Sequence, residues 1–148
     1  MIRAVRTFVL IVGLIVIGGG ILMAIWMMLL PSPPGLDLSR SKASTKGIFQ
    51  LAIEPEASSV NQGEIHSWFV TIKTKSCATV DDDAQVEIGG GMPDHNHGLP
   101  TRPKVTARLG DGRYRVDGVK FSMSGWWELR FAVSAAAGID EATFNLVL

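Results

Sequence analysis

The chain has 148 residues, of which 47% are hydrophobic and 19% are charged, and its acidic and basic residues balance at 14 each. This length accommodates one ordinary domain of about 100–150 residues and excludes most multidomain enzymes. Two bases, Arg3 and Arg6, precede an apolar N-terminal segment, so the rest of the chain holds 12 bases against 14 acids. This balance argues against a nucleic-acid-binding protein, which should show a basic surface. The single cysteine, Cys77, excludes an intramolecular disulfide.

The apolar segment covers residues 8–30 and contains no charged side chain. At about 1.5 Å per residue, a helix over this span is roughly 34 Å long, enough to cross a bilayer core of about 30 Å. A cleaved signal peptide has a shorter apolar run that ends at a pair of small residues. Here the run ends at Pro31 after large apolar residues. We therefore expect residues 1–30 to be a retained transmembrane anchor rather than a cleaved leader.

The flanking charges predict the orientation of this anchor. Arg3 and Arg6 lie close to the segment, whereas the bases that follow it (Arg40, Lys42 and Lys46) come after a proline-rich stretch. Positive residues next to a membrane helix favour the cytoplasmic side. We expect a single-pass protein of a bacterial inner membrane, which contacts lipid through residues 8–30 and carries its C-terminal domain in the periplasm. The glycines at 18–20 either fit the helix of a membrane-protein partner or simply loosen the anchor.

Residues 31–46 are predicted to be a Pro/Ser-rich linker. The sequence Pro-Ser-Pro-Pro-Gly at 31–35 cannot continue a helix and favours an extended chain. The polar run up to Lys46 offers few groups for a core. The folded domain is therefore expected to cover residues 47–148.

From residue 47 onward, hydrophobic residues recur mostly with a period of two, which is typical of strands. Trp127, Leu129 and Phe131 should point into a core, with Trp68 and Val70 facing them. The connection at 135–138 is expected to be a hairpin turn rather than a helical one. With no helical pattern, about seven short strands in about 100 residues indicate an all-β, immunoglobulin-like antiparallel β-sandwich. The expected strands are 49–53, 67–73, 84–88, 105–109, 114–121 with a bulge or sheet switch at 117–118, 126–133 and 144–148.

The loop that follows the third expected strand carries the candidate chemistry. Its sequence from Met92 to Gly98 places His95 and His97 two positions apart, with glycines before it and prolines after it. Imidazole is the commonest metal ligand, and thioethers beside it favour copper, especially Cu(I). The candidate thioether ligands are Met92 in this loop and Met123, which lies at a corner between two later strands. The alternative is that both histidines are polar loop residues and both methionines are core packing.

Other polar residues give weaker signals. His66 is expected to be a surface or cap residue at the start of a strand. Cys77 is a thiolate ligand, a partner for an external thiol or a small buried residue. The acidic run 81–83 lacks the glycine and distal glutamate of a calcium-binding loop and is read as a solvated turn. No nucleophile stands beside a base, so we do not expect an enzyme.

Three motifs in order resemble the YtkA-like domain, which is grouped with the FixH-like membrane-anchored proteins: residues 91–98, 110–114 and 123–129. The resemblance covers about residues 48–148. It implies an exported immunoglobulin-like sandwich associated with copper handling or with assembly of respiratory oxidases. The family's Met-Pro-x-x-x-His-like loop matches Met92, His95, His97 and Met123, which are the expected metal ligands here. With so few histidines and methionines, the domain does not resemble a high-capacity copper store.

Two functions are consistent with this sequence. In the first, a membrane-tethered exported domain binds one copper ion and hands it to a membrane or periplasmic partner, or helps to assemble that partner. In the second, the chain is a non-metal accessory subunit of a respiratory-type membrane complex, and the sandwich is its docking surface. If the first is correct, Asp94 should lie beside the ion and orient a histidine without binding the metal.

Overall fold

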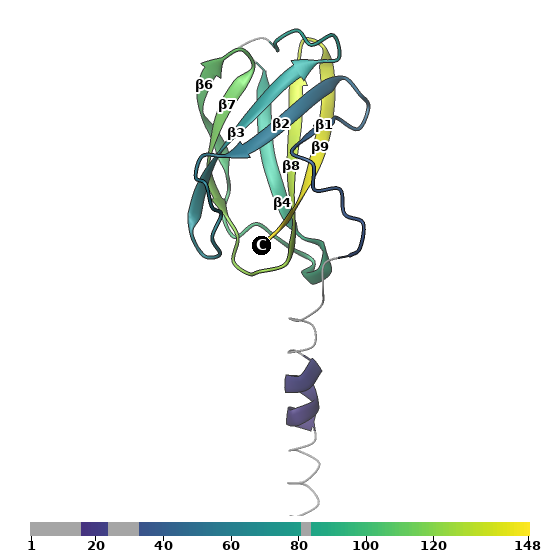
Figure 1. Cartoon of the computed structure of the whole chain (residues 1–148), viewed down its shortest axis with the longest axis vertical. Coiled ribbons are helices and arrows are strands. Elements are labelled where there is room, and N and C mark those ends of the chain that lie inside the picture. The colour runs from purple at the N-terminus through teal and green to yellow at the C-terminus, as the bar shows by residue number, and fades with distance from the viewer. Residues whose placement is uncertain (1–15, 24–32, 81–83) are drawn as a thin grey trace, which may run out of the picture. The chain divides into compact units, whose positions relative to one another are not determined.

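The computed structural model describes residues 16–23, 33–80 and 84–148 of two compact units, Met1–Pro31 and Ser32–Leu148. In the first unit, residues 16–23 are helical (Figure 1). Their large apolar side chains are exposed. Within the described residues, no helix has both the length and the apolar character needed to cross a bilayer. The remainder of the expected anchor, residues 1–15 and 24–30, lies outside the described residues.

The second unit consists of antiparallel strands arranged in two sheets. Among its described residues, one sheet has five strands in the order β1-β2-β3-β7-β6, and the other has four in the order β5-β4-β8-β9. A short 3-10 helix, η1 (Pro93–His95), lies between β4 and β5. The strands are β1 (Ser41–Ala43), β2 (Phe49–Pro55), β3 (Ile65–Thr74), β4 (Gln85–Met92), β5 (His97–Gly98), β6 (Lys104–Gly110), β7 (Arg113–Lys120), β8 (Trp126–Ala135) and β9 (Gly138–Val147).

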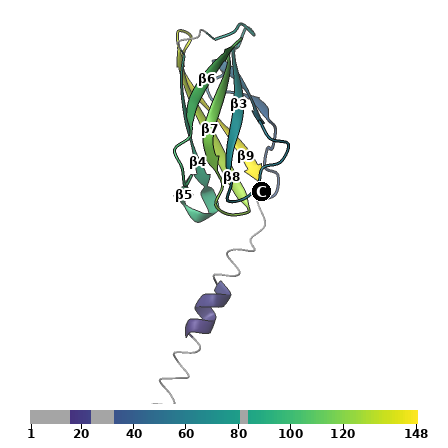
Figure 2. The same cartoon turned by 90° about the vertical axis from the view of Figure 1, so that its left-hand side faces the viewer.

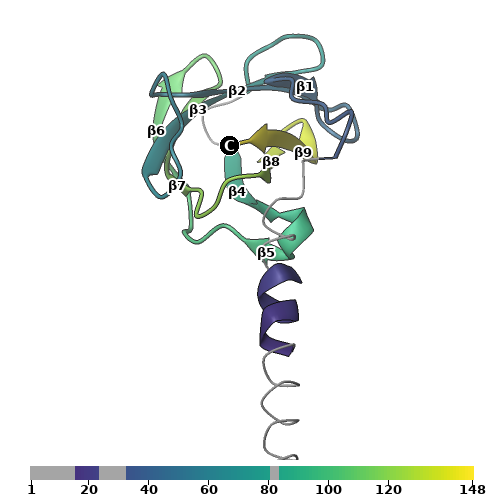
Figure 3. The same ribbon diagram turned by 60° about the horizontal axis from the view of Figure 1, so that its bottom comes forward.

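The two sheets form the layers of a β-sandwich, as the view in Figure 3 shows. Buried and exposed residues alternate along β2, β3 and β8, because successive side chains of a strand point to opposite faces. Trp127, Leu129 and Phe131 of β8 are fully buried and share one hydrophobic cluster with Trp68 and Val70 of β3. The predicted antiparallel sandwich and its predicted core residues are confirmed.

An expected bulge and an expected hairpin turn are also confirmed. On β7, Val116 pairs with Trp68 and Val119 pairs with His66. Two residues of β7 therefore lie opposite a single residue of β3. This is a bulge at residues 117–118, and β7 continues through it without changing sheets. Ala135 pairs with Gly138, which makes the 135–138 segment the hairpin connection between β8 and β9.

The folded unit starts earlier than the sequence suggests. Residues 41–46, assigned above to the linker, contain β1, which pairs with β2, and the buried residue Ser44. β1 shows no alternation of apolar residues. Ser41 and Ala43 are exposed, and only Lys42 is partly covered. Main-chain hydrogen bonds to an edge of the sheet hold this strand, and hydropathy does not report such bonds.

A buried carboxylate connects this early segment to the last strand. Asp140 of β9 accepts hydrogen bonds from the Ser44 hydroxyl at 2.5 Å and from the backbone N–H groups of Lys46 at 3.0 Å and Ile48 at 3.2 Å. Burial acts to raise the pKa of Asp140, but these bonds and one from the Glu141 N–H outweigh it and lower the pKa from 3.8 to about 2. The ionised carboxylate therefore stabilises the junction between the two sheets.

Replacing Phe131 tests the core. A buried Phe→Ala change typically costs about 3–5 kcal/mol of unfolding free energy, out of a total of about 5–15 kcal/mol for a domain. Phe131→Ala should lower the urea midpoint sharply. Arg130→Ala, on the exposed side of the same strand, should hardly move it, since its ion pair with Glu128 is long (3.6 Å) and open to solvent. Equal shifts would mean that the faces of β8 are assigned incorrectly.

Acid titration tests the Asp140 cluster. Its pKa is lower in the folded than in the unfolded chain, so its stabilising contribution is complete above the ordinary pKa of 3.8 and is lost as pH falls toward about 2. Urea midpoints measured across this range should fall less steeply for Asp140→Asn than for the native protein. Asp94→Asn, at an exposed carboxylate, is the matched control and should follow the native curve. Parallel curves for Asp140→Asn and the native chain would contradict the assignment.

Candidate metal site

The histidines lie in a tight reversal of the chain at one end of the sandwich, here called the His loop (residues 92–98). The sequence suggested an irregular loop starting after residue 88, but β4 continues through the glycine run to Met92. The 3-10 turn η1 follows, and Asn96, in the left-handed conformation (φ 49°), redirects the chain into β5. There Gly98 pairs with Gly91 and His97 pairs with Met92.

Close backbone contacts explain the glycine run. A Cβ atom on Gly91 would lie 2.3 Å from the His97 carbonyl oxygen, and one on Gly90 would lie 2.1 Å from the Glu128 carbonyl oxygen. Both values are far below van der Waals contact, so any larger residue would push β4 away from β5 and β8. Gly89 faces open space instead. The glycines at 90 and 91 therefore allow the His loop to fold back against the sheet.

His95 and His97 lie side by side. Their ring centroids are 5.8 Å apart with an interplanar angle of 28°. His97 is exposed and His95 is partly exposed. The Nδ1 of His97 lies 3.4 Å from the Gly98 carbonyl oxygen. In the neutral tautomer that donates this long hydrogen bond from Nδ1, the other nitrogen, Nε2, carries the lone pair that a metal ion needs.

Met92 shares a sheet face with His97. Residues that pair directly across an antiparallel ladder project to the same side, with Cβ atoms about 4.5–5.5 Å apart. Unlike His97, Met92 is only 2% exposed and belongs to the hydrophobic core. Its Cε atom lies 3.2 Å from the point where a Cβ on Gly125 would sit. The thioether therefore lies at the base of the His loop, against the β7–β8 connection.

Met123 belongs to that connection, and Trp127 links it to the His loop. The Trp127 indole N–H donates to the Met123 carbonyl at 3.0 Å, while the same ring meets the His97 ring edge-on at 6.1 Å. Figure 2 shows the end of β4, β5 and the start of β8 at one end of the sandwich. Met123 is half-buried against the core. Among the described contacts, none joins Met123 directly to either imidazole.

A shallow hollow of about 270 Å³ lies beside these residues, and both Met92 and His97 contribute to its lining. Glu128 and Arg130 form another wall, and their side chains approach each other at 3.6 Å. Sequence reasoning missed both residues. The only available signal was their position on the outer face of the strand that contains Trp127.

The remaining polar candidates do not join the His loop. His66 was expected at the surface, but it is only 6% exposed, and its Nε2–H donates to the Asn61 carbonyl at 2.8 Å. Cys77 is exposed, in a turn with φ 62°, so it is not a buried packing residue. Residues 81–83 lie outside the described ranges. Within those ranges no three His, Cys, Asp or Glu side chains gather in one place.

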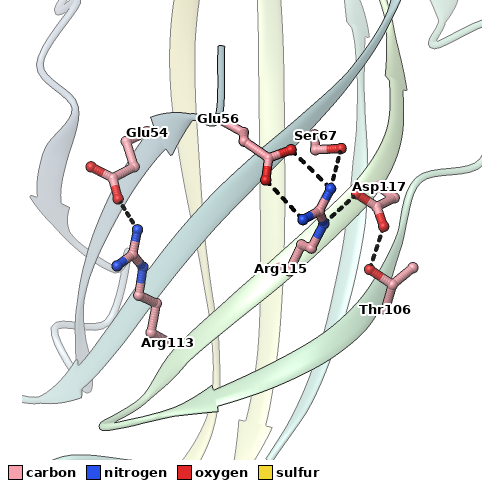
Figure 4. A network of polar contacts seen from close by, with 7 residues as sticks. All are labelled: Glu54, Glu56, Ser67, Thr106, Arg113, Arg115 and Asp117. Atoms are coloured by element: carbon pink, nitrogen blue, oxygen red, sulfur yellow. Dashed lines mark hydrogen bonds and ion pairs between the residues drawn. The ribbon is translucent and has the colours of Figure 1, made fainter.

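A network of ion pairs on the outer face of the five-stranded sheet is separate from this site (Figure 4). Arg115 donates to both carboxylate oxygens of Glu56 at 2.8 Å and to Asp117 at 3.0 Å. Arg113 pairs with Glu54 and lies over the Phe69 ring, 4.3 Å from its centroid. The charges of this network satisfy one another across β2, β3 and β7, which suits a structural role.

Two neighbouring glycines test the backbone geometry of the His loop. Gly91→Ala should disrupt the β4–β5 pairing because its methyl group would meet the His97 carbonyl. We expect faster amide exchange at Met92 and His97, and displaced ring signals for His97, in NMR spectra. Gly89→Ala adds the same methyl group to open space and should leave these signals unchanged. Indistinguishable spectra for the two variants would show that close approach does not shape the loop.

Comparison with known proteins places this fold and loop in a family. Neither a curated protein nor a solved structure matches the chain significantly. The model of one family, described as YtkA-like, matches residues 41–132. That match begins at the first residue of β1 and extends into β8, so it includes the whole His loop and the Met123 connection. The chain belongs to the YtkA-like family.

Proposed function

We propose that this chain is a membrane-tethered, exported domain that binds a single copper ion at the His loop and transfers it to a membrane or periplasmic partner. The observation that carries the proposal is the juxtaposition of His95 and His97, 5.8 Å between ring centroids, with Met92 paired opposite His97. Imidazole together with thioether is a donor set that suits Cu(I) better than zinc or the hard cations.

The four proposed ligands differ in how they meet solvent. Met92 is buried, Met123 and His95 are half-buried, and His97 is exposed. An ion held by these side chains would lie at the boundary between core and solvent. The buried Met92 thioether would stay in place, while a ligand of the incoming partner could displace the exposed His97 imidazole. A transfer protein needs such an accessible side, whereas a storage protein encloses its metal.

The proposed cellular setting rests on the N-terminal segment. Residues 8–30 are free of charge, and the apolar side chains of the helical stretch 16–23 are exposed, which suits a lipid environment. We propose a single-pass anchor in a bacterial inner membrane, with an immunoglobulin-like domain in the periplasm, as in the FixH-like proteins. The proline-rich segment after the anchor would let the His loop reach a partner in or near the membrane.

Cu(I) affinity, measured on the full-length chain by competition with a chromogenic chelator, tests this function. His95→Ala and His97→Ala should each weaken binding at least about tenfold, which corresponds to about 1.4 kcal/mol. Met92→Leu and Met123→Leu should also weaken binding, but with little loss of stability, since a Met→Leu exchange usually costs under about 1.5 kcal/mol.

His66→Gln is the control for the histidine variants, because glutamine retains a donor for the Asn61 carbonyl. It should bind Cu(I) as tightly as the native chain. If the double variant His95→Ala/His97→Ala also does so, the metal site is elsewhere or absent. The accessory-subunit function, in which the sandwich only docks onto a membrane complex, would then take its place.

A further inference from the structure

One edge of the four-stranded sheet has no full-length neighbouring strand among the described residues. In the order β5-β4-β8-β9, strand β5 is so short that it pairs only with Gly91 and Met92 of β4. The rest of β4, residues 85–90, pairs with β8 on one side and borders no strand of its own sheet on the other. An edge of this kind presents main-chain groups that another strand can use.

A hydrogen bond at one end of this edge shows which groups point outward. The Gly90 carbonyl accepts from the Leu99 N–H at 3.1 Å, on the side away from β8. Main-chain groups alternate sides along a strand, and the β4–β8 register has no shift, so those of Val86 and Ile88 point the same way as those of Gly90. The described residues supply no hydrogen-bond partner for these outward N–H and C=O groups of Val86 and Ile88.

A groove lies beside this free edge, lined by residues of β4 in one sheet and of β6 in the other, two strands whose course Figure 2 shows. It consists of a hollow of about 440 Å³ next to residues 86–90 and a second of about 350 Å³ that continues along β6. Its apolar side chains are partly buried and pack against the core: Val86, Ile88, Leu99 and Val105. A strand placed there would find main-chain partners on one side and an apolar floor beneath alternate side chains.

The described charges around the groove are mostly positive. Among the described residues that line it, Arg102, Lys104 and Arg108 are exposed cations and Glu87 is the one acid; the acidic run 81–83 lies outside the described residues. None of the three cations forms an ion pair with another described residue. This contrasts with the outer face of the same sheet, where Arg113 and Arg115 are matched by carboxylates.

A β-bulge directs one of these cations into the groove. Val105 pairs with Val116 but Ala107 pairs with Arg115, so Thr106 is an extra residue on β6. After this bulge, Arg108 lies opposite the buried Tyr114, on the inner side of the sheet. Its guanidinium reaches across to the Ala84 carbonyl at 3.3 Å. Without the bulge, residue 108 would share the outer face with Arg115.

We infer that the free edge of β4 binds an extended, acidic segment of a partner protein by β-strand addition. Its main chain pairs with Val86 and Ile88, its inward side chains are apolar, and its acidic side chains meet Arg102, Lys104 and Arg108. A second copy of this chain is the less suitable occupant, because pairing β4 with β4 of another copy would bring identical cationic rims together. Gly90 lines both this groove and the hollow beside His97, so a bound segment would lie next to the His loop.

Selected strand peptides test this inference on the full-length chain in detergent. The probe is a displayed library of seven-residue segments in which valine, isoleucine or threonine alternates with randomised positions. We expect the binders to be enriched in aspartate and glutamate at the randomised positions. In a bound peptide strand, only the N–H groups of every second residue can face β4. Methylating the amide nitrogens of these residues in a selected peptide should weaken binding at least about tenfold. Methylating those of the intervening residues should not.

Variants of the protein locate the site. Ile88→Pro removes an N–H that points away from β8 and should abolish peptide binding, whereas Ile88→Val keeps this group and should bind normally. Arg102→Glu/Lys104→Glu should weaken binding of acidic peptides at least about tenfold. Lys73→Glu, an exposed charge reversal on β3 outside the groove, is the control and should change nothing.

Four results would overturn the inference. They are the absence of any binder, equal effects of the two methylation patterns, unchanged binding by both Ile88→Pro and the double charge reversal, and protection of the Val86 and Ile88 amides that rises with protein concentration in the absence of peptide. The last result would assign the edge to a second copy of the chain. Cu(I) affinity is measured separately, so failure of the metal proposal and failure of this one are distinguishable.

Discussion

The indole of Trp127 connects the hydrophobic core to the end of the sandwich where the His loop lies. Its ring is fully buried, packs edge-on against Phe121 at 5.3 Å and meets the His97 ring at 6.1 Å. The indole N–H of Trp127 donates to the Met123 carbonyl. The position of the β7–β8 connection is therefore coupled to the same side chain that contacts the His loop. Packing of Trp127 therefore helps to place His97 and the Met123 connection, while Met92 is itself part of the same core.

The parts of the fold that were predictable from sequence are those set by side-chain alternation. Trp127, Leu129 and Phe131 alternate with polar residues, and each is buried as expected. The strand β1 was not predictable in this way, because it pairs with β2 without any alternation of apolar side chains. The burial of His66 depends on the Asn61 carbonyl and the Phe121 ring, which tertiary structure brings together. Hydropathy along the chain contains no information about either contact.

The candidate site was likewise predictable from the sequence only in part. The residue types of the His loop pointed to metal ligation, and the structure brings His95, His97 and Met92 into one small region. The need for glycine at 90 and 91 was not predictable, because the atoms that exclude a Cβ belong to His97 and Glu128. The free edge of β4 was not predictable from the sequence either. It arises because β5 ends after two residues, and no local pattern marks the length of a neighbouring strand.

The bonds of Asp140 also have a consequence for the time course of folding. Ser44 and Asp140 are separated by 96 positions, and the neighbouring Thr45 N–H donates to the Glu141 carbonyl over the same separation. Folds dominated by such distant contacts form slowly, because a long segment must close before the contact forms. A chain that leaves the ribosome or a translocation channel from its N-terminus would wait for β9 before completing the junction. Until then β1 and β2 would present an open sheet, so folding of this domain would depend on protection from aggregation.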